Sequence, residues 1–266
     1  MENLQEIIRA TIPVIEKAGD FIRKQAGNVT LEQIEQKSLN NLVSYVDKTA
    51  EEMLVEGLRP IMPEAGFLTE EETVEQLDAD WKWVVDPLDG TTNFLHQIPL
   101  FSVSVALMYK NEVKCGWVLD IMHHDMFYAW KNGGAYLNGK PIKVSSQEDF
   151  GQALLVTGFP YGKPEVMERY VDVFHYLMLN TRGVRRLGSA AIDLAYVACG
   201  RFEAFYEYKL NPWDVAGGSI IVKEAGGIVM DFEGGEDYLF GKQIIATNCK
   251  ITKGLTDVIK DRFFET

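Results

Sequence analysis

The point where an apolar run meets two aspartates constrains this chain more than any other feature. Residues 83–85 predict a buried strand, and the run ends abruptly at Asp86, which Asp89 follows three residues later. Pro87 fixes its own backbone and removes one donor, whereas Gly90 allows backbone amides to approach whatever lies in the turn. Both carboxylates are therefore expected to leave a rigid strand end together, beside free N–H groups and hydroxyls.

Two carboxylates held so close favour a bound cation. At about 4 Å they repel each other by roughly 4 kcal/mol in an effective dielectric of ~20. A divalent cation removes that cost, and hard oxygen ligands favour Mg²⁺, Ca²⁺ or Mn²⁺. Because exposed amides and bound cations together attract anions, the turn predicts a binding site for a phosphate group.

The bulk properties of the chain exclude several classes of protein. Its 266 residues suffice for one large domain or two small ones. A formal net charge of −13 argues against a general nucleic-acid surface. No apolar run approaches the ~20 residues that span a bilayer, and the acidic, polar start is unlike a signal peptide. The three scattered cysteines indicate a reducing compartment and no zinc site, so we expect a cytoplasmic protein without a membrane partner.

Apolar spacing predicts the order of helices and strands. A long amphipathic helix is expected over residues 4–22, a loop at 37–41 and a second helix over 46–58. Further helices are expected over about residues 164–179, 190–198 and 215–225, with one more at the C-terminal end. Strands are expected near residues 67–69, 83–85, 101–108, 113–122, 126–130, 153–157, 202–206, 228–231 and 244–246.

This order of elements predicts the class of fold. Central strands with helices between them give a layered α/β or α+β sandwich. No repeat, low-complexity tract or Pro/Ser-rich linker divides the sequence. We therefore expect one compact domain over residues 1–266, with two sheet layers at roughly 1–150 and 151–266.

Three further acidic features are candidates for the same site. Glu70 opens a run of three acids after an apolar step, Asp214 stands at an expected helix start, and Asp47 opens the second helix. Each also has a structural interpretation, because helix-start aspartates satisfy free amides and an acidic run is often a solvated face. Taken singly, none of the three decides between structure and function.

The combination of motifs carries a resemblance to a known family. Glu70-Glu71, the segment from Asp86-Pro87-Leu88-Asp89-Gly90 to Phe94, and Trp213-Asp214-Val215-Ala216-Gly217-Gly218 resemble the signature motifs of the inositol monophosphatase family. That family belongs to the lithium-sensitive, Mg²⁺-dependent phosphatases. Further matches lie at residues 188–191, 223–227 and 246–248. The resemblance implies an α+β fold, the layered αβαβα sandwich of the inositol monophosphatase and fructose-1,6-bisphosphatase type, and a homodimer.

The resemblance also implies a set of metal ligands for two or three Mg²⁺ ions. Glu70, Asp86 and the backbone carbonyl of Leu88 would hold the first ion. Asp86, Asp89 and Asp214 would hold the second, and a third, weaker ion would depend on Glu70 and water. Two metals of this kind can stabilise the attacking and leaving oxygens of an in-line displacement.

The remaining implied roles concern water and substrate. Glu70 is expected to act in catalysis, with Thr91 and Asp47 as a pair that orients the attacking water. The amides of Gly90 and Thr91 would grip the phosphate. The expected contacts with the inositol ring are Asp89, Ser189, Ala190 and Glu207. The implied partner is thus a small phosphorylated polyol, with no nucleic acid.

Several alternatives stay open from the sequence. A sister phosphatase of the same group would act on fructose 1,6-bisphosphate, NADP or 3′-phosphoadenosine 5′-phosphate, and a metal-dependent binding protein would use the fold without turnover. Thr69 departs from the Gly that often precedes the paired acids. Arg185 and Arg186 are candidates for contact with a substrate or a neighbouring subunit, and a structural ion pair is the expected role for at least one of them. Residues 37–41 resemble the loop that closes near the metals in this family.

Overall fold

The computed structural model describes residues 3–29, 34–38, 41–77, 79–160 and 164–264, with the backbone alone at 34–38 and 41–43. Within these residues the chain forms helices separated by two larger sheets and one two-stranded ribbon. No described helix combines the length and apolar character needed to cross a bilayer. The helices are α1 (Leu4–Gln25), α2 (Tyr45–Leu58), α3 (Thr91–Leu95), α4 (Pro164–Asn180), α5 (Ala190–Ala198), α6 (Pro212–Glu224) and α7 (Thr252–Ile259).

The larger sheet has seven strands in the order β3-β4-β5-β6-β7-β8-β9, and the smaller has five in the order β11-β10-β12-β14-β13. The seven are β3 (Gly66–Thr69), β4 (Trp81–Asp89), β5 (Ser102–Tyr109), β6 (Glu112–Asp120), β7 (Asp125–Trp130), β8 (Gly134–Leu137) and β9 (Lys140–Pro141). The five are β10 (Leu154–Thr157), β11 (Gly183–Arg185), β12 (Ala204–Tyr208), β13 (Ile228–Met230) and β14 (Gln243–Thr247). The ribbon pairs β1 (Ile34–Ser38) with β2 (Asn41–Ser44).

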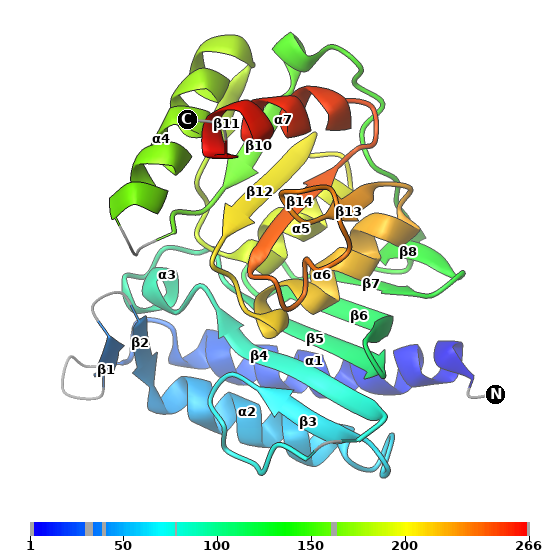
Figure 1. Ribbon diagram of the computed structural model, residues 1–266. Coiled ribbons are helices and arrows are strands. Elements are labelled where there is room, and N and C mark those ends of the chain that lie inside the picture. The colour runs from blue at the N-terminus through cyan, green and yellow to red at the C-terminus, as the bar shows by residue number, and fades with distance from the viewer. Residues whose placement is uncertain (1–2, 30–33, 39–40, 78, 161–163, 265–266) are drawn as a thin grey trace.

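The helices and sheets stack in five layers (Figure 1). Helices α1 and α2 cover one face of the seven-stranded sheet, α5 and α6 lie between the two sheets, and α4 and α7 cover the outer face of the five-stranded sheet. This arrangement confirms the predicted α+β fold, a layered αβαβα sandwich. The expectation of one domain over residues 1–266 stays a prediction.

Strand β4 shows why its sequence is so apolar. Trp83 and Val85 pack into the core shared with α1 and α2, whereas Val84 packs into the core shared with α5 and α6. Successive side chains of a strand point to opposite faces, so a sheet covered on both faces requires apolar residues at every position. The strand that leads to the aspartates is therefore buried on both sides and rigidly placed.

Two local predictions were wrong. β4 does not end at Asp86 but continues to Asp89, with an irregular register between the two, where Pro87 offers no donor to the ladder. Residues 37 and 38 belong to β1 and Asn41 opens β2, not a loop, while residues 39–40 lie outside the described residues. A two-stranded ribbon is held by backbone hydrogen bonds, so polar side chains do not prevent its pairing.

Most other expected elements are confirmed to within a few residues. The sequence reasoning did not anticipate the short elements α3, β8, β9 and β11. All four have five residues or fewer, and such short segments carry too little periodicity to be recognised. Of these, α3 matters most for the site, because it begins directly after Gly90.

Helix α6 lies so close to the larger sheet that Gly217 is required. A Cβ at this position would stand 2.9 Å from the carbonyl oxygens of both Trp117 and Val105. Since backbone atoms cannot swing away, Gly217→Ala is expected to lower the free energy of unfolding by about 1–3 kcal/mol in a urea titration. Gly151→Ala, whose nearest neighbour is the Asp149 side chain at 3.3 Å, is the matched control. Equal unfolding free energies for the two variants would contradict this packing.

Candidate active site

The register of β3 against β4 brings Glu70 beside Asp86. The two strands run parallel with Thr69 opposite Val85, and the Glu70 amide donates to the Val85 carbonyl at 3.2 Å. The next residue of each strand is therefore the acid. The two carboxyls are in hydrogen-bonding contact, and this contact raises the pKa of Asp86.

The start of α6 reaches the same point from the other side. Asp86 pairs with Ser104 of β5, and the Ser104 hydroxyl donates to the Trp213 carbonyl at 3.1 Å. Asp214 follows directly and accepts a hydrogen bond from the Asn211 amide through Oδ2, at 2.6 Å. Asp214 thus closes a capping box for α6, and its charge is one of those that act on Asp86. The structural and functional interpretations of Asp214 are compatible.

Asp89 is held by the start of α5. Its Oδ2 accepts from the Ser189 hydroxyl at 2.6 Å and from the Ala191 amide at 2.8 Å. Ser189 is itself the N-cap of α5 and lies 3.0 Å from the Ser102 hydroxyl. These donors fix the orientation of the Asp89 carboxylate at the end of β4.

The converging acids raise one another's pKa values. Burial, followed by the charges of Glu70, Asp89 and Asp214, raises the pKa of Asp86 well above its usual range. Burial and the Asp89 charge raise the pKa of Asp214 to about 8, and burial raises the pKa of Asp89 to about 6. A cluster of this kind requires protons or a cation to remain folded near neutral pH.

The side chains of the cluster are of the type that binds a hard cation, but they are not arranged around a metal position. Within the described residues, no three His, Cys, Asp or Glu side chains are arranged as a ready metal site. One reason is that Glu70 and Asp86 contact each other, while Asp86 Oδ1 accepts from the Leu88 amide at 3.0 Å. All side chains in the cluster are nonetheless carboxylates, the ligands that Mg²⁺ prefers. A divalent cation would offset the mutual repulsion of these carboxylates.

Thr91 and Asp47 meet at the edge of this cluster. The Thr91 hydroxyl lies 3.1 Å from Asp47 Oδ1 and 2.9 Å from the Leu88 carbonyl, and either oxygen can accept its hydrogen. Asp47 Oδ2 accepts from the amide and hydroxyl of Ser44, each at 2.8 Å, in the capping box of α2. Burial raises the pKa of Asp47 against the opposing effect of these bonds. The pair is present, and its role with water stays a prediction.

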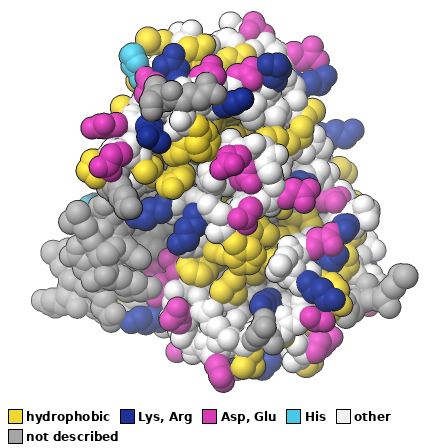
Figure 2. All heavy atoms as spheres, in the orientation of Figure 1, with side chains coloured by type: hydrophobic (Ala, Val, Ile, Leu, Met, Phe, Trp, Pro, Cys, Tyr) yellow, Lys and Arg dark blue, Asp and Glu magenta, His cyan; other side chains and the backbone are white. Residues whose placement is uncertain are grey.

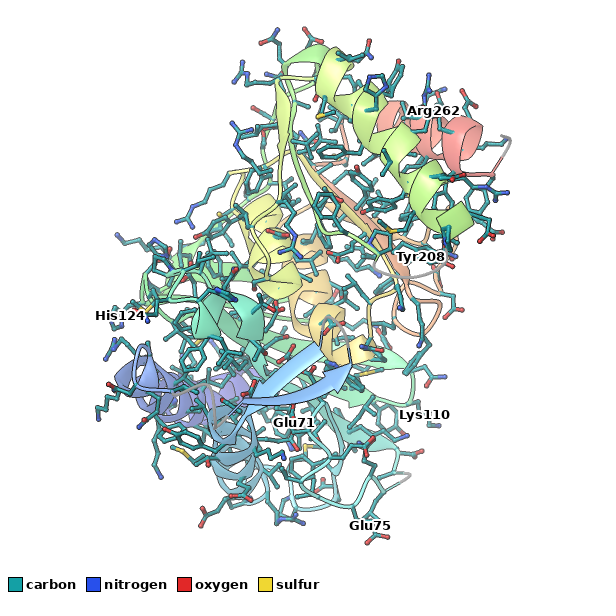
Figure 3. All side chains as sticks on the ribbon, turned by 90° about the vertical axis from the view of Figure 1, so that its left-hand side faces the viewer. Glu71, Glu75, Lys110, His124, Tyr208 and Arg262 are labelled. Carbon is teal, nitrogen blue, oxygen red and sulfur yellow. The ribbon has the colours of Figure 1, made fainter. Side chains whose placement is uncertain are left out.

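The predicted substrate contacts lie on the side of the five-stranded sheet. Glu207 is half-buried on β12, and its carboxyl lies so near Gly158 that a Cβ there would stand 2.0 Å from Oε1. Burial raises the pKa of Glu207 to about 8, with the charge of Arg186 opposing the rise. Ser189 and Ala190 are buried, and the Ser189 hydroxyl is engaged by Asp89. Glu71 and Tyr208 in Figure 3 mark the two halves of the molecule from which Glu70 and Glu207 come.

Sequence reasoning missed a buried acid that supports the site. Glu51 accepts hydrogen bonds from the Thr69 hydroxyl, the Glu71 amide, and both the amide and hydroxyl of Thr73, at 2.7–2.9 Å. It therefore fixes the segment that carries Glu70, and Thr69 fits this position because its hydroxyl is used. Glu51 lies four residues after Asp47, on the same face of α2, and that spacing was the available signal.

Comparison with known proteins finds similarity to one family in both sequence and structure. The sequence profile of the inositol monophosphatase family matches residues 3–262. The Nus factor SuhB of Escherichia coli K12 is 38% identical over 259 residues, which cover 97% of each chain. The solved SuhB of Bartonella henselae has a TM-score of 0.91 at 36% identity, covering 96% of this chain and 98% of its own. The solved Thermotoga maritima IMPase has a TM-score of 0.88 at 33% identity, covering 97% and 98%.

The fold is that of the inositol monophosphatases, and the chain belongs to the inositol monophosphatase family. Members of this family are phosphatases that generally depend on Mg²⁺. This confirms the resemblance found in the sequence motifs.

The raised pKa values predict how stability depends on pH without metal. In the folded state Asp89 and Asp214 hold protons up to about pH 6 and about pH 8, whereas the unfolded chain releases them near pH ~4. Their contribution to stability is thus complete below pH ~4 and is lost as pH rises through these values. In a chelator, the melting temperature is expected to fall between pH 6 and pH 8.5. Asp214→Asn should flatten this fall, and a melting temperature that rises over the same interval would contradict it.

Proposed function

We propose that the chain is a Mg²⁺-dependent phosphomonoesterase that hydrolyses inositol 1-phosphate to inositol and phosphate. The observation that carries this proposal is the convergence of Glu70, Asp89 and Asp214 on the buried carboxyl of Asp86. The cluster lies beside the Thr91–Asp47 pair. Two or three Mg²⁺ ions are proposed, held by Glu70, Asp86, the Leu88 carbonyl, Asp89 and Asp214. The bound ions would supply Lewis acidity and lower the pKa of a coordinated water.

The protein's own groups account for binding and orientation. The Thr91 hydroxyl donates toward Asp47 or the Leu88 carbonyl, so its lone pairs are left to accept a hydrogen bond from a water molecule and hold that water in place. The amides of Gly90 and Thr91 begin α3 and are proposed to bind phosphate oxygens. Gly90 has φ +95°, and a Cβ would lie 3.2 Å from the Gly188 carbonyl, so this turn requires glycine.

Phosphate release from a small panel of substrates tests the proposal. The panel contains inositol 1-phosphate, glycerol 2-phosphate, fructose 1,6-bisphosphate, NADP and 3′-phosphoadenosine 5′-phosphate, each with and without Mg²⁺. Preference for inositol 1-phosphate is expected, because Glu207 suits the hydroxyls of a polyol. Preference for another member would assign a sister phosphatase activity. No release from any of them would favour a metal-dependent binding protein.

The partners and setting of the chain also remain proposals. We infer a homodimer in the cytoplasm, which the mass in solution and cell fractionation would test. Relatives named Nus factor SuhB make a role of that kind a second candidate. The inferred absence of a nucleic-acid partner rests on the net charge of −13. The face in Figure 2 agrees with it, since Lys and Arg are interspersed there with Asp and Glu. RNA binding at physiological salt would overturn that inference.

A further inference from the structure

Arg186 stands beside the substrate side of the site without a paired acid. It lies between β11 and the N-cap of α5, and its side chain is exposed. The guanidinium lies over the ring of Phe159, 5.7 Å from the ring centroid. Within the described part of the chain, no carboxylate lies within ion-pairing distance of it. Its charge is therefore available to a ligand.

Arg186 nevertheless belongs to the site. Burial raises the pKa values of Asp89, Asp193 and Glu207, and the positive charge of Arg186 opposes all three rises, so it is near all three. Its Nη1 packs against the backbone at Gly188, where a Cβ would stand only 2.6 Å away. Gly188 directly precedes the N-cap of α5, and the guanidinium is thus held at the edge of the substrate side.

Glu207 and Arg186 flank the same short stretch of backbone. The Glu207 carboxyl contacts Gly158, and the ring beneath Arg186 belongs to the next residue, Phe159. A hydroxyl acceptor and a cation thus lie side by side where the alcohol part of a substrate is expected. A neutral polyol needs only the first of these, and the cation has no use in its recognition.

We propose that Arg186 binds a second anionic group of the substrate, a phosphate or a carboxylate on the alcohol part. The substrate class thereby extends to phosphate monoesters that carry a second negative charge, such as sugar bisphosphates. A guanidinium binds such groups with two parallel hydrogen bonds, and one ring against its face leaves the N–H edges free. This inference rests on the proposed phosphatase function.

Two other roles for Arg186 make different predictions. If the arginine only offsets the charge of the nearby acids, its loss would affect all substrates alike. If it contacts a second subunit, its loss would change the mass in solution together with activity toward every substrate. A role in recognising a second anion affects one class of substrate and leaves the mass unchanged.

The test compares kcat/KM for fructose 1,6-bisphosphate and inositol 1-phosphate in saturating Mg²⁺. Arg186→Gln is expected to lower the value for the bisphosphate about 10–100-fold, mainly through KM, with inositol 1-phosphate changed less than about 3-fold. Arg186→Lys should lie between, because it keeps the charge but loses the paired donors. Arg185→Gln is the matched control, since Arg185 is exposed and donates to the carbonyl of Val184.

Other results of these assays would overturn the inference, and each result identifies which part of it is wrong. Equal losses for both substrates, or no loss for the bisphosphate, would remove Arg186 from second-anion recognition. Wild-type protein that hydrolyses inositol 1-phosphate but not the bisphosphate would overturn the inference and leave the proposed function standing. Failure to hydrolyse any phosphate monoester would overturn the proposed function itself.

Discussion

Asp86→Asn is expected to lower Mg²⁺-dependent kcat for inositol 1-phosphate by on the order of 10³-fold or more. Asp86 lies at the centre of the cluster, since Glu70, Asp89 and Asp214 all act on its pKa. It is also the residue that both proposed ions share. The amide keeps the shape of the side chain but removes its negative charge, so the loss would be one of cation binding.

The same variant should remain folded, and this separates a chemical effect from misfolding. Removing one of several mutually repelling acids relieves a repulsion of roughly 4 kcal/mol per close pair at an effective dielectric of ~20. In a chelator, the melting temperature of Asp86→Asn is therefore expected to equal or exceed that of the wild type. Asp20→Asn, at an exposed ion pair with Arg23, is the control. Full activity of Asp86→Asn would remove Asp86 from the site.

Thr91→Val is expected to lower kcat about 10²–10³-fold with little change in KM. The substitution keeps the volume of the side chain and removes the hydroxyl that contacts Asp47 and the Leu88 carbonyl. The attacking water would then lack its positioning group, a loss of the size associated with proton-transfer partners. Thr91→Ser should recover most of the activity, because it restores the hydroxyl.

The neighbouring threonine supplies a matched control. Thr92 lies in the same short helix α3 but is exposed, so Thr92→Val should leave kcat within about 3-fold of the wild type. If Thr91→Val and Thr92→Val had the same small effect, the water would be oriented by another group. Steady-state kinetics at saturating Mg²⁺ would distinguish the two results.

Local sequence patterns were enough to predict the parts of the site that lie within one segment. The turn from Asp86 to Gly90 and the helix start at Asp214 each carry their signal in neighbouring residues. The spacing of these two segments in the sequence did not predict that they lie close together. Their proximity depends on the hydrogen bond from Ser104 of β5 to the Trp213 carbonyl. Only the resemblance to the family joined these segments before the structure did.

Supporting residues were harder to predict for the same reason. Glu51 looks like an ordinary acid of an amphipathic helix, yet it is fully buried and holds the segment around Glu70. Asp193 lies within the helix that was expected over residues 190–198, but it is also buried, and the charges of Glu207 and Arg186 act on it. Burial depends on contacts far away in sequence, which a single chain read linearly does not reveal.

Direct counting of bound metal tests the role of the acidic cluster without depending on any substrate. Mn²⁺ in place of Mg²⁺ allows the free ion to be followed by electron paramagnetic resonance during titration. Wild-type protein is expected to bind at least two ions per chain in competition with Mg²⁺, and Asp86→Asn at least one fewer. Wild-type protein that binds no Mn²⁺ at millimolar concentration, or an Asp86→Asn variant that binds as many ions as the wild type, would contradict a metal centre at these carboxylates.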